Sequence, residues 1–108
     1  MNKPKKKKVV YLAGPITGVE NYWEPFENAD DVLSSWGFIV LNPARLPQGM
    51  TREQYMRICH SMIDCADIVL FLPHWYRSEG ATVEWTYCKY NGKTTVYSIE
   101  ELLTGVTK

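Results

Sequence analysis

The sequence predicts a single α/β domain in which helices cover both faces of a doubly wound parallel sheet of four to five strands. Three observations support this prediction. The chain has 108 residues, a common length for one domain with one hydrophobic core. Short apolar runs alternate with segments of helical periodicity, which is the rhythm of successive βαβ units. No repeat or low-complexity linker interrupts this series, so right-handed crossovers are expected to give one parallel sheet.

The first third of the chain is expected to form a strand–helix–strand unit. Val9–Ala13 is apolar throughout and precedes a Gly-Pro pair, as in a strand that is buried on both faces. A helix then begins at Asn21 or shortly after it, because Pro25 fits only a first turn, and it ends at Gly37. Its buried stripe is predicted from the spacing of Phe26, Ala29, Leu33 and Trp36. The second strand is Phe38–Leu41.

The middle of the chain repeats this pattern. Thr51 and Gln54 have the spacing of a capping box, which opens a helix that runs to about Cys65. The inner stripe of this helix is predicted to be Tyr55, Ile58, Met62 and Ile63. The third strand is Ile68–Leu72, and Pro73 ends it.

The last third of the chain supplies another helix and strand and a short final helix. Gly80 opens the helix, which continues to Tyr90 and stops at Asn91 and Gly92. Thr94–Tyr97 is the fourth strand, and residues 99–103 form the last helix. In doubly wound sheets, ligands bind outside the carboxyl ends of the strands. We therefore expect the site in the segments that follow the first three strands, namely residues 14–20, 42–50 and 73–80.

Composition argues against several classes of protein. With 45% hydrophobic and 22% charged residues, the chain matches a packed globule rather than a disordered polymer. No apolar run reaches the roughly 18 residues of a spanning helix, and we expect no secretory leader because the N-terminal lysines precede no apolar segment. Three cysteines without C-x-x-C spacing indicate neither a disulfide framework nor a zinc cluster. These features predict a cytoplasmic protein without a membrane partner.

The charge is unevenly distributed along the chain. Five of the twelve Lys and Arg residues lie in residues 3–8, so we expect a basic tail at residues 1–8 and a domain at residues 9–108. From Val9 onward, seven basic residues face twelve acidic ones, a net charge of −5. A domain of this sign repels a phosphate polymer, which argues against a nucleic-acid polymer as partner. A small anionic ligand held by local backbone groups fits better.

The segment Gly14–Gly18 follows the first predicted strand directly. Its two glycines allow the backbone to approach a ligand closely, and the free N–H groups of a turn before a helix suit a phosphate. The segment lacks the lysine of a Walker loop and the spacing of a dinucleotide-binding loop. An ordinary tight connection between strand and helix is therefore the alternative.

The segment Ser78–Glu84 runs from the third strand into the next helix. With Gly80 near the helix start, Glu84 lies about one turn in, on the same face as Ala81 and Cys88, and this face looks toward the sheet. The helix dipole favours a carboxylate there while burial disfavours it, and such opposing influences are typical of carboxylates used in chemistry. The alternative is an exposed glutamate that only complements the dipole.

Five short motifs lie in order at the ends of the predicted strands. They are Val10-Tyr11-Leu12-Ala13-Gly14-Pro15, Asn42-Pro43, Asp67-Ile68-Val69, Pro73-x-Trp75 and Ser78-x-Gly80-Ala81-x-x-Glu84. Together they resemble the nucleoside 2-deoxyribosyltransferase superfamily, and most closely its small DUF4406 branch of bacteria and phages. The resemblance covers roughly residues 8–98. It implies that residues 9–108 form one domain of this type with a flavodoxin-like fold.

The resemblance also implies an activity, namely cleavage of the N-glycosidic bond of a nucleoside or its 5′-monophosphate without a cofactor. In the relatives, the carboxylate at the position of Glu84 attacks C1′ of the sugar, and water or a second base then takes the sugar. Departure of the base builds positive charge on the sugar, which an adjacent carboxylate stabilises and captures. Tyr11 would orient Glu84, unless it is a core aromatic whose hydroxyl binds elsewhere. We expect substrate contacts at Gly14, Pro15, Ile16, Thr17, Asn42, Trp75, Ser78 and Gly80.

One position departs from the pattern of the relatives. They carry an aspartate eight residues before the residue equivalent to Asp67, and Cys59 stands there in this chain. A thiol, with an ordinary pKa of about 8.5, is neither an acidic proton donor nor a permanent anion. Asp64 and Asp67 are expected at the far end of the helix, and His60 is a candidate replacement unless it is a core or solvated histidine. The alternative function is therefore a non-catalytic protein that binds a nucleotide to sequester or sense it.

The loop after the third strand and the aromatic content give three further expectations. An aromatic such as Trp75 could stack on a base and Arg77 could contact a phosphate, although packing or a subunit contact is the alternative. His60, His74 and the cysteines lack metal-ligand spacing, so we expect no metal. Four Trp and seven Tyr in so small a domain suggest aromatics covered by another subunit, which predicts a homo-oligomer, a dimer or higher.

Overall fold

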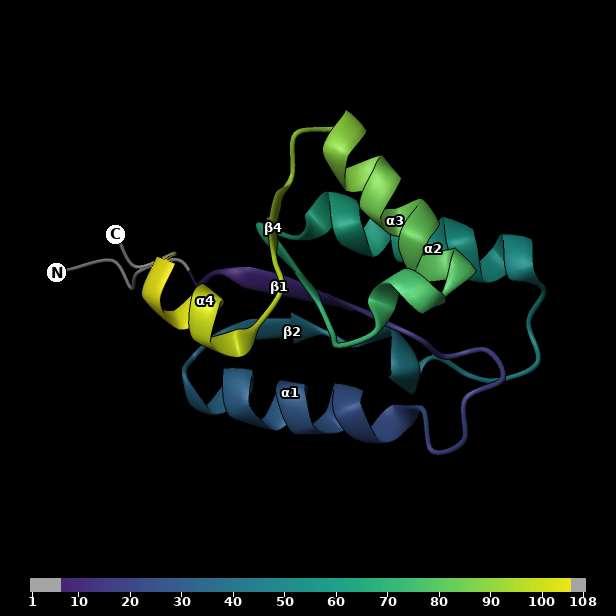
Figure 1. The fold of residues 1–108 in the computed structure, drawn as a ribbon, viewed down its shortest axis with the longest axis horizontal. Helices are drawn as coiled ribbons and strands as arrows, with labels where there is room; N and C mark the ends of the chain where they lie inside the picture. The colour runs from purple at the N-terminus through teal and green to yellow at the C-terminus, as the bar shows by residue number, and fades with distance from the viewer. Residues whose placement is uncertain (1–6, 106–108) are drawn as a thin grey trace, which may run out of the picture.

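A computed structural model describes residues 7–105 and contains a four-stranded, all-parallel sheet between two layers of helices (Figure 1). The strands are β1 (Val9–Ala13), β2 (Ile39–Leu41), β3 (Ile68–Phe71) and β4 (Thr94–Val96). The helices are α1 (Trp23–Ser35), α2 (Arg52–Cys65), α3 (Glu79–Tyr90) and α4 (Ile99–Gly105), with one-turn 3₁₀ helices η1 (Pro43–Arg45) and η2 (Trp75–Arg77). The predicted α/β fold with a doubly wound parallel sheet is confirmed, with four strands. Residues 1–6 of the expected basic tail lie outside the described residues.

The order of the strands places a crevice at the centre of the sheet. The order is β2-β1-β3-β4, so β1 pairs with β2 on one side and with β3 on the other. Tyr11 of β1 is in register with Leu41 of β2 and Val69 of β3. The chain leaves β1 toward one side of the sheet and leaves β3 toward the other, so the loops after these two strands diverge. This is the switch point at which doubly wound sheets bind ligands.

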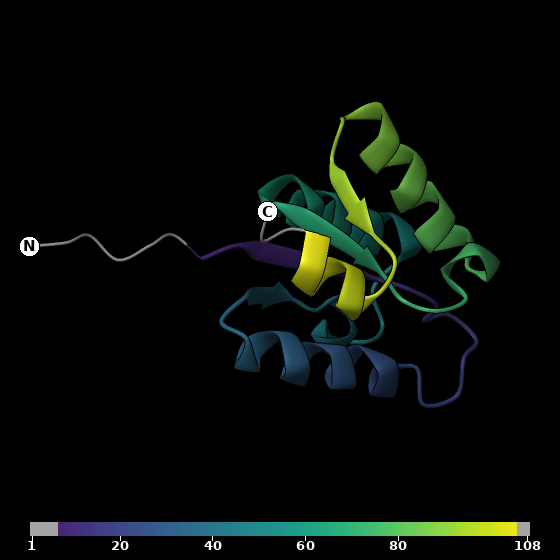
Figure 2. The ribbon, with the colours of Figure 1, turned by 60° about the vertical axis from the view of Figure 1, so that its left-hand side comes forward.

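The two faces of the sheet are covered by different helices. Figures 1 and 2 show α1 on one face and α2 with α3 on the other. Successive side chains of a strand point to opposite faces, and β1 shows this clearly: Val10 and Leu12 belong to the core beneath α1 and α4, whereas Tyr11 and Ala13 belong to the core beneath α2 and α3. Each strand residue is therefore assigned to one of two separate cores.

The helix ends that face the crevice have side-chain caps. Thr51 and Gln54 form the predicted capping box of α2 in both directions. The hydroxyl oxygen of Ser78 accepts from the backbone N–H of Ala81, so α3 begins at Glu79, one residue before the predicted start at Gly80. The Ser78 hydroxyl replaces an intrahelical acceptor that the first turn lacks.

Two predictions about helix stripes need correction. Trp36 is 66% exposed rather than buried, because α1 ends at Ser35 and Gly37, with a φ of +91°, turns the chain away. The buried residues of α2 are Cys59 and Ile63, while the other predicted positions, Tyr55, Ile58 and Met62, are only half-buried. The buried face of α2 is thus narrower than the spacing of its apolar residues predicts.

Candidate functional site

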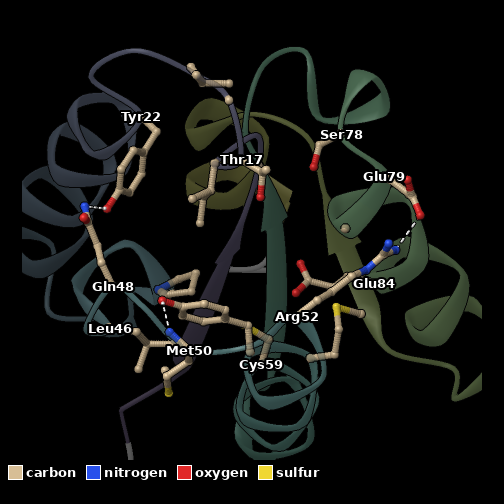
Figure 3. A pocket seen from close by; sticks show the side chains of 18 of the residues that line it. Thr17, Tyr22, Leu46, Gln48, Met50, Arg52, Cys59, Ser78, Glu79 and Glu84 are labelled. Atoms are coloured by element: carbon tan, nitrogen blue, oxygen red, sulfur yellow. Dashed lines mark hydrogen bonds and ion pairs between the residues drawn. The ribbon is translucent and has the colours of Figure 1, made fainter.

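A cavity of about 900 Å³ opens at the carboxyl ends of β1 and β3, on the side of the sheet that α2 and α3 cover (Figure 3). This volume lies in the range of small-molecule sites. Seven of the predicted site residues line it: Tyr11, Gly14, Ile16, Thr17, Ser78, Gly80 and Glu84. The structure therefore brings together residues from β1, from the loop after it and from the start of α3, as the position of the switch point requires.

Three of the predicted site residues do not line this cavity. Pro15 lines a smaller neighbouring cavity of about 310 Å³. Asn42 is buried and organises the end of β2: its amide donates to Asp30 at 3.1 Å and its carbonyl oxygen accepts from the backbone N–H of Ala44 at 2.9 Å. Trp75 packs among other aromatic rings, with its ring centroid 5.0 Å from that of Phe71. Asn42 and Trp75 thus have structural partners in place of the expected ligand.

Glu84 is the buried carboxylate of the cavity. Its side chain is only 6% exposed, on the face of α3 that also buries Ala81 and Cys88, as the spacing predicts. Its Oε2 accepts a hydrogen bond of 2.8 Å from the Tyr11 hydroxyl. Burial raises the pKa of Glu84 from 4.5 to about 7, although hydrogen bonds from Tyr11 and Cys59 oppose this rise. Glu84 therefore changes its ionisation state near neutral pH.

Tyr11 is a proton donor that remains neutral. It is 1% exposed at the centre of the sheet, and burial, followed by the nearby charge of Glu84, raises its pKa well above 10.0. The phenol therefore stays protonated and donates to Glu84. The alternative, in which the Tyr11 hydroxyl bonds to another residue, is wrong. A protonated donor stabilises the ionised form of its acceptor.

Cys59 completes this cluster from α2. Its side chain is 8% exposed, lines the cavity and interacts with both Tyr11 and Glu84. Burial raises the pKa of the Cys59 thiol to about 11, so the group is a neutral thiol at physiological pH. Tyr11, Cys59 and Glu84 therefore form a cluster, called the buried triad below, in which only Glu84 ionises near neutrality.

The other candidates for the role of an acid near Cys59 lie elsewhere. Asp67 accepts from the backbone N–H of Val9 at 2.8 Å, and Asp64 accepts from the Tyr87 hydroxyl at 2.7 Å, so both lie at the amino end of the sheet as predicted. His60 stacks on the Tyr87 ring with a centroid distance of 4.3 Å and does not line the cavity. His60 is therefore a packing residue and not a replacement for the aspartate of the relatives.

The mouth of the cavity contains residues that the sequence did not predict to be site residues. Gln48 donates to the Tyr22 hydroxyl at 2.9 Å, and Figure 3 shows this pair on the opposite side of the cavity from Ser78 and Glu79. The Tyr55 hydroxyl donates to the Pro47 carbonyl at 2.5 Å and so fixes the loop after η1. Apolar and basic side chains also line the cavity, including Leu46, Met50, Arg52 and Met56. The sequence indicated that residues 42–50, which follow β2, lie near the site. It did not indicate which of their side chains line the cavity.

Neither a metal site nor a membrane-spanning helix is found in the described part of the chain. Within residues 7–105, no three His, Cys, Asp or Glu side chains converge on a point that a metal ion could occupy. In the same range, no helix has both the length and the apolar character that crossing a bilayer demands.

The fold and the site together define an α/β domain that holds a buried carboxylate in a cavity at the switch point of a parallel sheet. Residues 8–97 match the family described as "Domain of unknown function (DUF4406)". The chain therefore belongs to the DUF4406 family, and the match spans the whole sheet and the buried triad. A comparison with curated proteins gives no match.

Proposed function

We propose that this protein breaks the N-glycosidic bond of a nucleoside or nucleoside 5′-monophosphate, by hydrolysis or by transfer of the 2-deoxyribosyl group, with Glu84 as nucleophile. The motifs that resemble the nucleoside 2-deoxyribosyltransferase superfamily suggest this chemistry. The observation that supports it most strongly is the position of Glu84, a carboxylate that is 6% exposed, lines a cavity large enough for a nucleotide and is oriented by Tyr11.

In the first step, an oxygen of Glu84 attacks C1′ of the sugar. Oε2 accepts from Tyr11, and we assign the attack to Oε1. The C1′–N bond breaks, its electron pair leaves with the base, and a C1′–O ester bond forms. The base then takes a proton from solvent. Positive charge develops on the sugar as the base leaves, and a desolvated carboxylate stabilises that charge more strongly than one in water.

In the second step, the ester is resolved. A water oxygen, or a nitrogen of a second base, attacks C1′, and the C1′–O bond returns its electron pair to Glu84. The proton of the attacking group passes to solvent. Tyr11 keeps its own proton throughout, since its pKa is raised, and serves to hold Glu84 in position and to favour its ionised form.

One observation favours a second candidate function, a protein that binds a nucleotide without turning it over. Cys59, a neutral thiol, stands beside Glu84 where a second acid would assist departure of the base. The other acidic residues of the lining, Glu20 and Glu79, are exposed. On this alternative, ligand raises the melting temperature and no free base appears.

The test is release of free base from a panel of 2′-deoxynucleosides and their 5′-monophosphates. We expect the wild type to release base and Glu84→Ala to lose at least about 10³-fold in kcat/KM, because the nucleophile is removed. Glu53→Gln, a loss of one exposed negative charge outside the cavity, is the matched control and retains activity. Mass spectrometry of the quenched reaction should show the deoxyribosyl adduct on Glu84.

The outcomes separate the two functions. Equal activity of Glu84→Ala and the wild type would eliminate Glu84 as nucleophile. Thermal stabilisation by ligand with no base released over many hours would establish the binding function instead.

A further inference from the structure

The cavity wall carries an ion pair whose position is unusual. Arg52 is the first residue of α2 and Glu79 the first residue of α3, and both line the cavity. Arg52 Nη2 donates to Glu79 Oε1, and the two side chains are 62% and 75% exposed. Figure 3 shows Arg52 reaching past Glu84 toward Glu79. A guanidinium thus lines the same cavity as the buried triad, while its only ion-pair partner among the described residues is a solvent-exposed carboxylate.

The geometry of the Arg52–Glu79 ion pair makes it easier to separate than the ion pair between Arg45 and Glu27. Arg45 holds Glu27 with two bonds of 2.8 Å, from Nε and from Nη2, in the fork geometry that makes such pairs strong. Arg52 holds Glu79 through a single N–H group. Exposed pairs with one contact contribute little, because solvent competes with both partners. The remaining N–H groups of Arg52 are available to another acceptor on the cavity side.

We propose that the Glu79 carboxylate occupies the position on Arg52 that the phosphate of the substrate takes. On binding, the phosphate displaces Glu79 from Arg52. Arg52 thereby selects phosphorylated nucleosides over nucleosides. This inference rests on the nucleotide chemistry proposed for the site and names the part of the substrate that a nucleoside lacks.

The cavity lining offers a cation for the phosphate and a place for the released carboxylate. Its lining holds two cations, Arg52 and Arg77, and three acids, Glu20, Glu79 and Glu84. Exchange of Glu79 for a phosphate on Arg52 leaves the guanidinium paired with an anion, so the exchange does not create an unpaired cation. The released Glu79 stays in the first turn of α3, where the helix dipole favours a negative charge. A planar guanidinium also matches the paired oxygens of a phosphate.

Arg77 is the competing candidate for the phosphate anchor. It lines both cavities, and no ion pair to it is found within residues 7–105. The two candidates predict different behaviour of Glu79 variants. If Arg52 is the anchor, Glu79 competes with the phosphate directly and its removal tightens binding in a way that needs Arg52. If Arg77 is the anchor, removal of Glu79 acts only as a general loss of negative charge.

The experiment is isothermal titration calorimetry on the full chain in a Glu84→Gln background, which keeps the substrate intact. The probes are the four common 2′-deoxynucleosides and their 5′-monophosphates. We expect Arg52→Gln to weaken monophosphate binding about tenfold or more and to leave nucleoside binding unchanged. Glu79→Gln should tighten monophosphate binding about two- to fivefold, because an internal competitor is gone. In the double variant Arg52→Gln/Glu79→Gln, that gain should disappear.

Matched controls separate exchange from long-range electrostatics. Arg57→Gln and Glu53→Gln make the same charge changes on exposed positions of α2 outside the cavity. The inference is overturned if Arg52→Gln behaves like Arg57→Gln, if Glu79→Gln tightens binding equally with and without Arg52, or if no monophosphate binds at millimolar concentration. Circular dichroism of each variant confirms that it is folded.

This experiment distinguishes failure of the inference from failure of the proposed reaction. Binding in the Glu84→Gln background requires no turnover. The expected pattern without any release of base by the wild type would support the exchange and the non-catalytic function together. Release of base by the wild type without the pattern would remove Arg52 and Glu79 from substrate selection and leave the reaction standing.

Discussion

The two faces of the central sheet carry different kinds of residue, although they share the same strands. Beneath α1 and α4, the core cluster is apolar, and the buried Asp30 of α1 is bound by Asn42 and Ser34. Beneath α2 and α3, the buried cluster includes Tyr11, Cys59 and Cys88, and Glu84 lies in hydrogen-bond contact with it. Both sides of the sheet bury a carboxylate, but only Glu84, beneath α2 and α3, lines the cavity, whereas Asp30 is bound by Asn42 away from it.

This difference assigns separate tasks to the two faces. The face beneath α1 contributes stability through burial and close packing. The face beneath α2 and α3 contains a carboxylate whose ionisation burial opposes, so it gives up stability at the position where chemistry is proposed. Truncation of an apolar side chain beneath α1 and neutralisation of Glu84 should therefore move stability in opposite directions.

The largest effect is expected on the apolar face. Leu33 of α1 is fully buried, so Leu33→Ala removes packed methyl groups and should lower the free energy of unfolding by about 3–5 kcal/mol. Urea denaturation at pH 7 measures this change. Val32→Ala, at an exposed position on the same helix, should stay within about 0.5 kcal/mol of the wild type. A loss at position 33 no larger than at position 32 would contradict the assignment of this face to stability.

On the opposite face, Glu84→Gln should stabilise the protein at pH 8. Below pH 4.5, Glu84 is protonated in both the folded and the unfolded state and has no effect on this balance. Between pH 4.5 and about 7, the unfolded state ionises first, so the wild type loses stability as pH rises. The rise in the pKa of Glu84 from 4.5 to about 7 corresponds to about 3 kcal/mol in the free energy of unfolding. Above pH 7, the wild type has lost this stability, whereas the variant has not. Thermal unfolding of both proteins from pH 4 to 8 measures this gap, and parallel curves would refute it.

A smaller effect is expected from Tyr11→Phe, which removes the hydrogen bond that favours ionised Glu84. In the wild type, the acid limb of kcat/KM should lie near pH 7, with activity rising as Glu84 ionises. In Tyr11→Phe, this limb should move about one unit toward higher pH, because a hydrogen bond to a charged acceptor is lost. The pH profile of base release is the measurement. An unmoved limb would show that Tyr11 does not support the ionised form.

The smallest effect is expected at Cys59, since a thiol is a weak hydrogen-bond donor. Cys59→Ser keeps a donor near Glu84 and should leave the acid limb within about 0.5 pH units of its position in the wild type, whereas Cys59→Ala should move it slightly upward. Loss of all activity in Cys59→Ser would instead make the thiol an essential group.

The sequence predicted much of the fold because its signals are local. The four strands and the capping box at Thr51 and Gln54 are each encoded within a few residues. The contact between Tyr11 and Glu84 was expected only from the resemblance to a known superfamily, and the structure contains the hydrogen bond between them. The function, the homo-oligomer and the cytoplasmic location stay predictions.

Other features depend on how distant elements pack, and the sequence could not supply them. Trp75 follows β3 as predicted, but an aromatic residue at a strand end has the same pattern whether it contacts a ligand or another ring, and Trp75 stacks on Trp85 at 5.9 Å. The contact between Arg52 and Glu79 joins two helix starts that lie 27 residues apart, so it depends on the relative placement of α2 and α3. Neither contact leaves a local signal.

The hydrogen bond between Tyr11 and Glu84 joins residues that are 73 positions apart in the chain. A ribosome must therefore complete α3 before the carboxylate can meet its phenol, and a nick anywhere between the two residues leaves them connected only by non-covalent packing. Such long-range pairing forms late compared with local helices, because the loop must close first. Fragments that end before Glu84 therefore cannot form the buried triad.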